Sequence, residues 1–228
     1  MITLIGVSKV YRPRRVALLD VNVHIGKGEF VFLTGASGAG KSTFLRLLYR
    51  EQTPTSGQVI VLGQDVARIP MRKVPYLRRQ IGVVFQDYKL LSDKTVWDNV
   101  AFPLLVTEHP PREIARRVPA VLEQVGLLGY EKNRAGELSG GEQQRVALAR
   151  SIVLNPAILL ADEPTGNLDA GTARIIADLI QDIHRRGSTV VMATHSDWIV
   201  NRLRQRVIHL RHGRIVADEY PGRYVHEA

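Results

Sequence analysis

The sequence contains no cysteine, so disulfide bonds and metal sites built from thiolates are excluded. It also has no apolar stretch of the roughly 18 residues that a membrane-spanning helix needs. The strand-like segment Ile2-Thr3-Leu4-Ile5 follows the N terminus directly, without the basic region and apolar core of a secretion signal. We therefore expect a cytosolic protein.

Acidic residues are outnumbered by basic ones. Asp and Glu total 22 and Lys and Arg total 31, which gives a formal net charge of +9 at pH 7. Such an excess suggests an acidic neighbour, either nucleic acid or an anionic membrane surface, and charge alone does not choose between them. The chain is 45% hydrophobic and 23% charged over 228 residues, so we expect an ordered protein with a sizeable core in one or two lobes.

A phosphate-binding loop of the form GxxxxGK[ST] stands at Gly35-Ala36-Ser37-Gly38-Ala39-Gly40-Lys41-Ser42. The apolar run 30–33 precedes it and the helix-forming segment 43–49 follows, which is the strand, loop and helix that such a motif requires. Its glycines let successive backbone N–H groups point at phosphate oxygens, and the helix adds the positive end of its dipole. We predict that Lys41 reaches the β- and γ-phosphates of a nucleoside triphosphate and that Ser42 holds Mg²⁺. The predicted nucleotide contacts here are Gly35, Ala36, Ser37, Gly38, Ala39, Gly40, Lys41, Ser42 and Thr43.

A hairpin is predicted ahead of this loop. Ile2–Tyr11 and residues 16–25 are β-like runs on either side of the basic turn Arg12-Pro13-Arg14-Arg15. Tyr11 ends the first run, where its ring can stack on an adenine base. The alternative is that Tyr11 only packs against the hairpin.

Two carboxylates end a buried strand. Residues 157–161 are an apolar run and Asp162 and Glu163 follow it, as expected of a parallel strand whose carboxyl end lies in a site. We predict that Asp162 holds Mg²⁺ through water and that Glu163 orients and deprotonates the attacking water. Buried carboxylates without a metal or cation are costly, so a purely structural role fits poorly.

Two other predicted strands also end in polar residues. Gln86 follows the apolar run 81–85, where its amide can bridge Mg²⁺ or the attacking water, and His195 follows 189–193 on the same sheet edge as Glu163. His195 is suited to contact a γ-phosphate. Taken alone, a glutamine or histidine at a strand end is commonly a surface residue.

The middle of the chain has helical periodicity. Apolar residues recur at helical spacing from Thr95 to Gly126, and Pro119 is expected to kink or split the second helix because an interior proline forfeits a backbone hydrogen bond. This segment has no cluster of catalytic residue types, so we interpret it as a helical subdomain inserted between two halves of a nucleotide-binding core.

A second anion site is predicted about one hundred residues after the first. Leu138-Ser139-Gly140-Gly141-Glu142-Gln143-Gln144-Arg145 opens a helix that should run to about residue 154, with Ser139 as its N-cap. Gly140 and Gly141 leave the first N–H groups bare for an anion. Two chains packed head to tail would place each nucleotide between the first site of one chain and the second site of the other. The alternative is an ordinary capped helix start.

Together these motifs resemble the ATP-binding subunits of ABC transporter-type complexes along the whole chain. The resemblance implies that Gln86 is the glutamine of a mobile loop, that 138–145 is the signature, that Glu163 is the catalytic base and that His195 is the switch histidine. It also implies that Asp169, in the turn Thr165-Gly166-Asn167-Leu168-Asp169, faces a partner chain.

The fold implied by this resemblance is an α/β P-loop NTPase of the ABC type. It has a RecA-like core with an antiparallel β-subdomain, formed by residues 1–87 and 157–228, and an inserted α-helical subdomain at 88–156. The resemblance further implies that two ATP molecules, with Mg²⁺, are clamped in a head-to-tail homodimer.

Within the family, the chain resembles in particular the FtsE-type ATPases of bacterial cell division, which pair with an integral membrane protein of the FtsX type. The segments that carry this resemblance are Tyr49-Arg50-Glu51, residues 74–87, Leu90-Leu91, residues 95–102 and the tail 206–224. It implies a peripheral protein on the cytoplasmic side of the cell membrane, whose ATP turnover changes the shape of FtsX and so controls cell-wall hydrolases.

Two alternatives remain. The turn at residues 165–169 also resembles that of lipoprotein-release and macrolide-export ATPases. ABC-type ATPases that act on DNA or ribosomes would suit the charge, but those of the DNA-repair kind split the core with long coiled coils and the ribosomal kind usually carries two cores. This sequence has one core without a heptad tract.

The segment after Gln86 is the predicted contact with the membrane partner. Tyr88, Leu90, Leu91 and Trp97 are aromatic or apolar where a solvated loop would be polar. Large apolar groups at the centre of an interface carry most of its energy. For Leu90 and Trp97 the alternative is that they fill the core between the two lobes.

Overall fold

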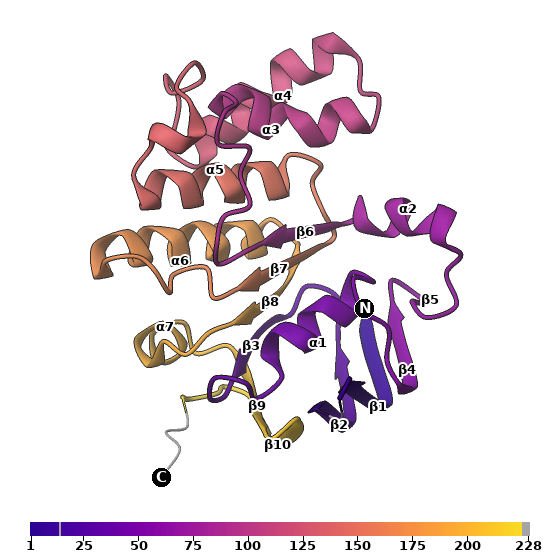
Figure 1. Cartoon of the computed structure of the whole chain (residues 1–228). Coiled ribbons are helices and arrows are strands. Elements are labelled where there is room, and N and C mark those ends of the chain that lie inside the picture. The colour runs from indigo at the N-terminus through magenta and orange to yellow at the C-terminus, as the bar shows by residue number, and fades with distance from the viewer. Residues whose placement is uncertain (14, 225–228) are drawn as a thin grey trace.

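The computed structural model describes residues 1–13 and 15–224, so Arg14 of the predicted basic turn lies outside the described residues (Figure 1). Its centre is a six-stranded sheet in the order β10-β9-β3-β8-β7-β6. The strands β3 (Phe30–Thr34), β6 (Ile81–Val84), β7 (Ile158–Asp162), β8 (Thr189–Ala193) and β9 (Arg206–Arg211) are parallel, and β10 (Arg214–Glu219) pairs antiparallel with β9. All residues of β3 and β8 are buried, as expected for parallel strands covered on both faces.

A second sheet has four strands in the order β2-β1-β4-β5. These are β1 (Ile2–Tyr11), β2 (Arg15–Ile25), β4 (Ser56–Val61) and β5 (Gln64–Asp65), and all of their pairings are antiparallel. The predicted hairpin of β1 and β2 is confirmed. Helix α1 (Lys41–Leu48) shares one hydrophobic cluster with this sheet and with one face of the central sheet, through Phe44, Leu45, Leu47 and Leu48.

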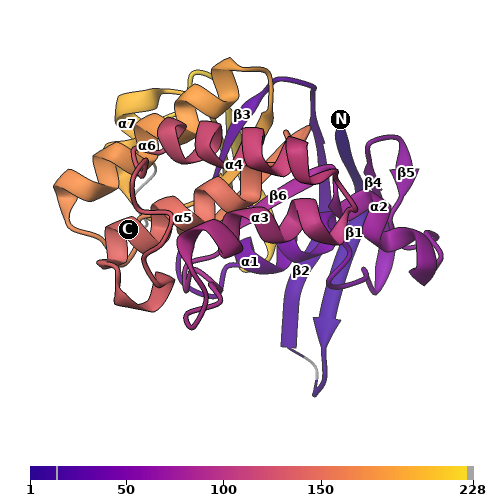
Figure 2. The ribbon, with the colours of Figure 1, turned by 90° about the horizontal axis from the view of Figure 1, so that it is seen from above.

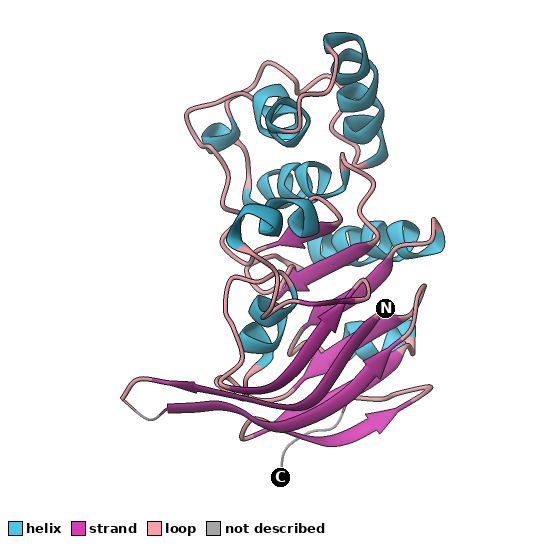
Figure 3. Ribbon diagram, turned by 90° about the vertical axis from the view of Figure 1, so that its right-hand side faces the viewer, coloured by secondary structure: helices cyan, strands magenta, loops and turns pink. Residues whose placement is uncertain are grey.

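Helices form one end of the molecule, as the side view of Figure 3 shows. They include α3 (Val96–Val106), α4 (Pro111–Gln124) and α5 (Gly140–Ile152), which in Figures 1 and 2 lie together beyond α6 (Ala170–Arg185). Their buried apolar residues join those of α6 and the central sheet in a second cluster. We propose that α3 to α5 belong to a subdomain of residues 88–156, inserted into a core of residues 1–87 and 157–228.

Short elements complete the chain. A 3₁₀ turn (Met71–Lys73) and α2 (Val74–Arg78) lead into β6, a second 3₁₀ turn (Ala135–Glu137) precedes α5, and α7 (Asp197–Leu203) follows β8. No helix within the described part of the chain is both long enough and apolar enough to span a bilayer. The architecture is an α/β fold with a mostly parallel central sheet and a separate antiparallel sheet, as expected of the predicted fold.

Pro119 does not split the second helix, and the other expected outcome, a kink, stays a prediction. Helix α4 is one element from Pro111 to Gln124 with Pro119 inside it. A proline forfeits one backbone hydrogen bond, but its neighbour Val118 and the next-turn Leu122 are fully buried in the core. Packing of this apolar stripe holds the helix together across the missing bond.

Candidate functional site

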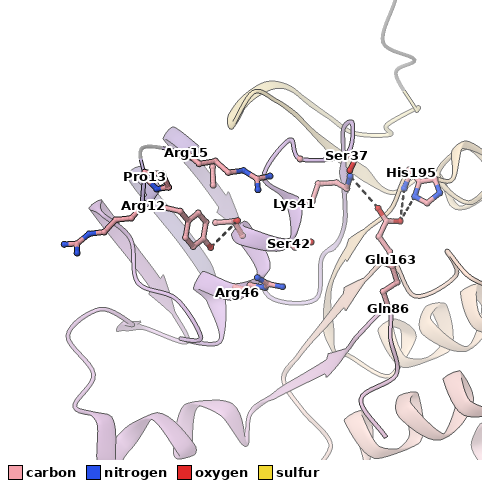
Figure 4. A pocket seen from close by; sticks show the side chains of 15 residues that line it. Arg12, Pro13, Arg15, Ser37, Lys41, Ser42, Arg46, Gln86, Glu163 and His195 are labelled. Atoms are coloured by element: carbon pink, nitrogen blue, oxygen red, sulfur yellow. Dashed lines mark hydrogen bonds and ion pairs between the residues drawn. The ribbon is translucent and has the colours of Figure 1, made fainter. Parts of the chain in front are cut away.

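A cleft with a volume of about 880 Å³ opens beside the loop between β3 and α1. Its lining comes from the β1–β2 hairpin, the loop before α1, α1 itself and the residues that follow β6, β7 and β8 (Figure 4). The parallel strands of the central sheet end at this side, which is where ligands bind in open α/β sheets.

The phosphate-loop motif has a backbone that depends on glycine. Gly35 has φ 135° and Gly40 has φ 112°, in the region that L side chains rarely adopt. An added Cβ at Gly35 would overlap the carbonyl oxygen of Leu210, and one at Gly40 would overlap that of Ala17. Among the residues that the structure describes, no side chain caps the N terminus of α1 at Gly40, so the first N–H groups of the helix are open to an anion.

Lys41 lies folded against this loop. Its Nζ donates to the carbonyl oxygens of Gly35, at 2.7 Å, and Ala36, at 3.2 Å, and stands 3.5 Å from Oε1 of Glu163. The residue is only 8% exposed. The ammonium group is therefore fixed between the phosphate loop and the end of β7.

Ser42, which lines the cleft, contacts Asp162 at the end of β7. The Ser42 hydroxyl donates to Oδ1 of Asp162 at 3.1 Å. Burial raises the pKa of the Asp162 carboxyl, and the hydrogen bond from Ser42 offsets part of this effect. A cation beside this carboxylate would compensate for its burial.

The donor set at this point fits Mg²⁺. Mg²⁺ is usually held by one or two carboxylates together with substrate phosphates and water rather than by an all-protein cage. The described residues contain no cluster of three or more His, Cys, Asp or Glu side chains that could hold a metal, but Ser42 and Asp162 offer a hydroxyl and a carboxylate beside the phosphate loop. Gln86, the third predicted ligand, lines the same cleft.

Glu163 follows β7 and is held by residues at the end of β8. Its backbone N–H donates to the carbonyl of Ala193 at 3.0 Å, and its φ of 49° is unusual for a residue with a side chain. Its Oε2 lies 2.8 Å from Nδ1 of His195 and accepts the His195 backbone N–H at 3.2 Å. With 12% of the side chain exposed, the carboxylate is fixed at the wall of the cleft between His195 and Lys41 (Figure 4).

Tyr11 stands at the other end of the cleft. Its hydroxyl is 3.4 Å from Oγ1 of Thr43, and Nζ of Lys9 lies 5.0 Å from the centroid of its ring. The tyrosine lines the cleft, as the predicted contact with adenine requires. The stacking itself stays a prediction.

The signature and Asp169 lie apart from this cleft, whose described lining includes neither. Ser139 caps α5 in a capping box with Glu142, which confirms the predicted N-cap, and its hydrogen bonds lower the pKa of Glu142. Asp169 caps α6, accepting hydrogen bonds from the backbone N–H and the hydroxyl of Thr172 that lower the pKa of its carboxyl. The second predicted anion site is therefore separate from the first within one chain.

Comparison with known proteins gives the family. The ABC transporter family matches residues 18–166 of the chain. The chain belongs to the ABC transporter family. It is 57% identical to "Cell division ATP-binding protein FtsE" of Mycobacterium tuberculosis over 98% of both chains. It is 49% identical to the protein of the same name from Bacillus subtilis, again over 98% of both.

Solved structures of ABC cassettes share the fold. A dimeric post-hydrolysis state of the ATP-binding cassette MJ0796, bound to ADP and Pi, matches with a TM-score of 0.89 and 33% identity over 98% of this chain and 100% of the other. CbiO1 of Clostridium perfringens matches with a TM-score of 0.88 and 29% identity over 96% of this chain and 88% of the other. Like other members of this ABC family, the protein is an ATPase.

Sequence reasoning about this ABC cassette missed five cleft residues and the packing role of Gly141. The residues that line the cleft but belong to none of the predicted contacts are Arg12, Pro13, Arg15, Ala17 and Arg46. Arg46 could have been found from its spacing, because it lies one helical turn after Ser42 and therefore on the same face of the helix. The direction of the Arg15 side chain depends on how the hairpin folds, which no local pattern shows. An added Cβ at Gly141 would overlap Cγ2 of Thr172, so this glycine lets the signature helix rest on the start of α6.

The residues predicted to contact the membrane partner differ in their burial in the structure. Leu90 and Trp97 are partly buried and pack against the core, as the alternative for them supposed. Tyr88 is half-buried, and Leu91 is 39% exposed. Asn99 holds the backbone of Leu91 beside α3, accepting from its N–H at 2.9 Å and donating to its carbonyl at 3.0 Å.

Proposed function

We propose that this chain is the Mg-ATP-hydrolysing subunit of a membrane-associated ABC complex that acts in bacterial cell division. The observation that carries the chemistry is the carboxylate of Glu163, fixed between His195 and Lys41 at the phosphate loop. The similarity over nearly the full length to proteins named as cell division ATP-binding proteins supports the cellular role.

In the proposed reaction, Tyr11 stacks on the adenine while the phosphate loop and Thr43 hold the phosphates. Lys41 turns from the loop carbonyls to the β- and γ-phosphates. Ser42, Asp162 and Gln86 would hold Mg²⁺, which when bound neutralises charge on the phosphate oxygens. These assignments rest on where the side chains stand around one cleft.

Glu163 acts as the general base in this proposal. Its Oε2 is engaged by His195, so the carboxylate cannot rotate freely, and Oε1 faces the loop where Lys41 stands. A positioned carboxylate accepts the proton of the attacking water as the bond to the γ-phosphate breaks. His195 keeps the carboxylate in place and contacts the γ-phosphate.

We propose a head-to-tail homodimer around two ATP molecules. Ser139, Gly140, Gly141 and Asp169 stand outside the chain's own cleft, as expected if they complete the site of a second copy. The bare N–H groups at the start of a helix suit a γ-phosphate presented by that copy. Dimeric structures of the related cassette MJ0796 support the formation of a homodimer.

The proposed partner is an integral membrane protein of the FtsX type, and its docking surface includes α3. Phe102, Leu105 and Val106 of this helix are 49%, 57% and 58% exposed. Through Asn99, Leu91 lies beside the same helix. An exposed apolar surface of this kind is typical of a protein interface. It includes residues of α3 that lie beyond the segment predicted from the sequence for the contact.

We propose that the protein is peripheral, on the cytoplasmic side of the cell membrane. The segment between Asp65 and Asp87 carries five basic residues, Arg68, Arg72, Lys73, Arg78 and Arg79, and no acidic one. Met71 and Tyr76 within it are 72% and 61% exposed. Basic residues interleaved with exposed apolar ones suit the surface of an anionic membrane.

Complementation tests the proposal. A bacterial strain depleted of its FtsE-type ATPase would express this chain together with the FtsX-type protein of the same source. The wild-type chain should restore division and co-purify with the membrane protein, whereas Glu163→Gln should co-purify without restoring division. Failure of the wild-type chain to bind the membrane protein, or recovery of DNA or ribosomes with it after high-salt washing, would contradict the proposed role.

A further inference from the structure

Two arginine residues flank the turn of the β1–β2 hairpin at the mouth of the nucleotide cleft. Arg12 and Arg15 both line the cleft, but their side chains differ in direction. Figure 4 shows Arg15 extending over the phosphate loop toward Lys41, while Arg12 extends away from it. Two residues of the same type on one turn are thus placed differently toward the phosphate loop.

Arg15 stands directly above the centre of the phosphate loop. One guanidinium nitrogen lies 3.7 Å from the position that a Cβ would occupy at Gly38. Gly38 has φ 80° and is exposed in the cleft, so its backbone is open to a ligand on the side from which Arg15 approaches. A phosphate cradled by the loop would lie within reach of the guanidinium.

The charge of Arg15 is not matched by a carboxylate. Within residues 1–13 and 15–224, no acidic side chain forms an ion pair with it, whereas Arg46 on the other wall of the cleft has Glu51 at 4.0 Å. Lys41 at the same loop is paired with Glu163, so Arg15 brings the unmatched positive charge to this loop. An anion held by the loop would match that charge.

A polyphosphate is the anion that fits. The planar guanidinium donates two parallel hydrogen bonds to phosphate oxygens, which gives geometric specificity as well as charge. The loop presents its N–H groups from one side and Arg15 approaches from the other. A monophosphate, with its single phosphate nearer the base, would not extend between them.

We propose that Arg15 is a specificity-determining residue that contacts the β- and γ-phosphates of the nucleotide and selects di- and triphosphates over monophosphates. This inference deepens the proposed ATPase function and rests on it. The hairpin then holds the nucleotide at two points, with Tyr11 on the base and Arg15 on the phosphates.

Calorimetric titration of the full chain with ATP, ADP and AMP tests this role. A Glu163→Gln background keeps ATP intact during the measurement. Arg15→Ala should weaken the binding of ATP and ADP about tenfold or more, as expected for the loss of hydrogen bonds between charged groups. It should change AMP binding less than about twofold, since AMP lacks the phosphates that Arg15 contacts. Arg15→Lys should lie between Arg15→Ala and the parent.

Arg12→Ala is the matched control, because it removes the same charge from the same turn. It should leave the affinities for all three nucleotides unchanged. Equal losses in Arg12→Ala and Arg15→Ala would show a general effect of charge, and equal losses for AMP and ATP would show that Arg15 only positions Tyr11. Either result would overturn the inference, as would unchanged binding in Arg15→Ala. If the parent chain itself bound no ATP, the proposed function would fail instead.

Discussion

Replacing Glu163 by glutamine separates catalysis from nucleotide binding. Glutamine keeps the shape of the side chain and can still accept a hydrogen bond from His195, 2.8 Å away, but it has no charge and accepts no proton. Loss of a positioned general base lowers the rate about 10² to 10⁴-fold, or about 2.7 to 5.4 kcal/mol at 1.36 kcal/mol per factor of ten. ATP binding should persist, because Glu163 holds no phosphate in the proposed site and its charge lies 3.5 Å from Lys41, where it opposes the binding of an anion.

Lys41→Ala should fail in the opposite way. This variant removes the ammonium that lies against the phosphate loop, so ATP affinity itself should fall. Equilibrium binding of ATP and single-turnover hydrolysis by the full chain measure the two effects separately.

Glu29→Gln is the control for removing a paired carboxylate. Glu29 lies 2.7 Å from Arg206, remote from the cleft lining, so its change should affect neither binding nor hydrolysis. Equal loss of ATP binding in Glu163→Gln and Lys41→Ala would refute the assignment of roles. Hydrolysis at the wild-type rate in Glu163→Gln would refute the assignment of Glu163 as the general base.

Four further outcomes are expected. Gly140→Asp on the Glu163→Gln background should keep ATP binding but abolish the ATP-induced dimer in light scattering. The control for steric effects is Gly140→Ala, because any Cβ at this position would lie 3.0 Å from the Tyr88 hydroxyl. Gly141→Ala should destabilise the fold by about 1 to 3 kcal/mol in denaturant unfolding, because its Cβ overlaps Thr172, and Gly166→Ala, with no neighbour closer than 3.5 Å, should cost less. Asp169→Ala should lower the thermal midpoint at pH 7, and this difference should shrink in acid, because hydrogen bonds lower the pKa of Asp169 and its capping is lost as pH falls through that value. Phe102→Asp should abolish co-purification of the membrane partner without changing ATP binding. Val216→Asp, at a residue of β10 that is 55% exposed, is the control and should leave co-purification intact. Co-purification retained in Phe102→Asp would remove α3 from the docking surface.

Local sequence signals predicted the core of the fold well. The apolar runs at β3, β7 and β8 are long enough and bounded clearly enough to identify buried parallel strands. Glu163 and His195, the polar residues that follow β7 and β8, do line one cleft. Ser139 followed by Glu142 is a pairing that acts within one helical turn, so its capping box was readable from spacing. The burial of Val96, Val100 and Leu104 on α3 likewise follows from periodicity.

Features that depend on distant contacts were not predictable in this way. No local pattern indicates that residues 206–219 form the strands β9 and β10. Arg206 on β9 pairs with Asp218 on β10 and with Glu29 ahead of β3, and these two acidic residues are far apart in sequence. The need for Gly141 comes from Thr172 on another helix, and the direction of Arg15 comes from the hairpin. The exposed face of α3 did leave a signal, because Phe102, Leu105 and Val106 fall outside its buried stripe.

Arg150 gives the loop after β6 a second attachment. From the signature helix α5, its guanidinium donates to the carbonyl oxygens of Tyr88, at 2.9 Å, and Lys89, at 2.7 Å. Burial lowers the pKa of this arginine. Two hydrogen bonds from one planar guanidinium group resist relative sliding of the loop and the helix. In the proposed dimer, the loop that leads to Leu91 and the helix whose start would face the ATP of the other copy are therefore tied to each other, so we expect them to move as one unit.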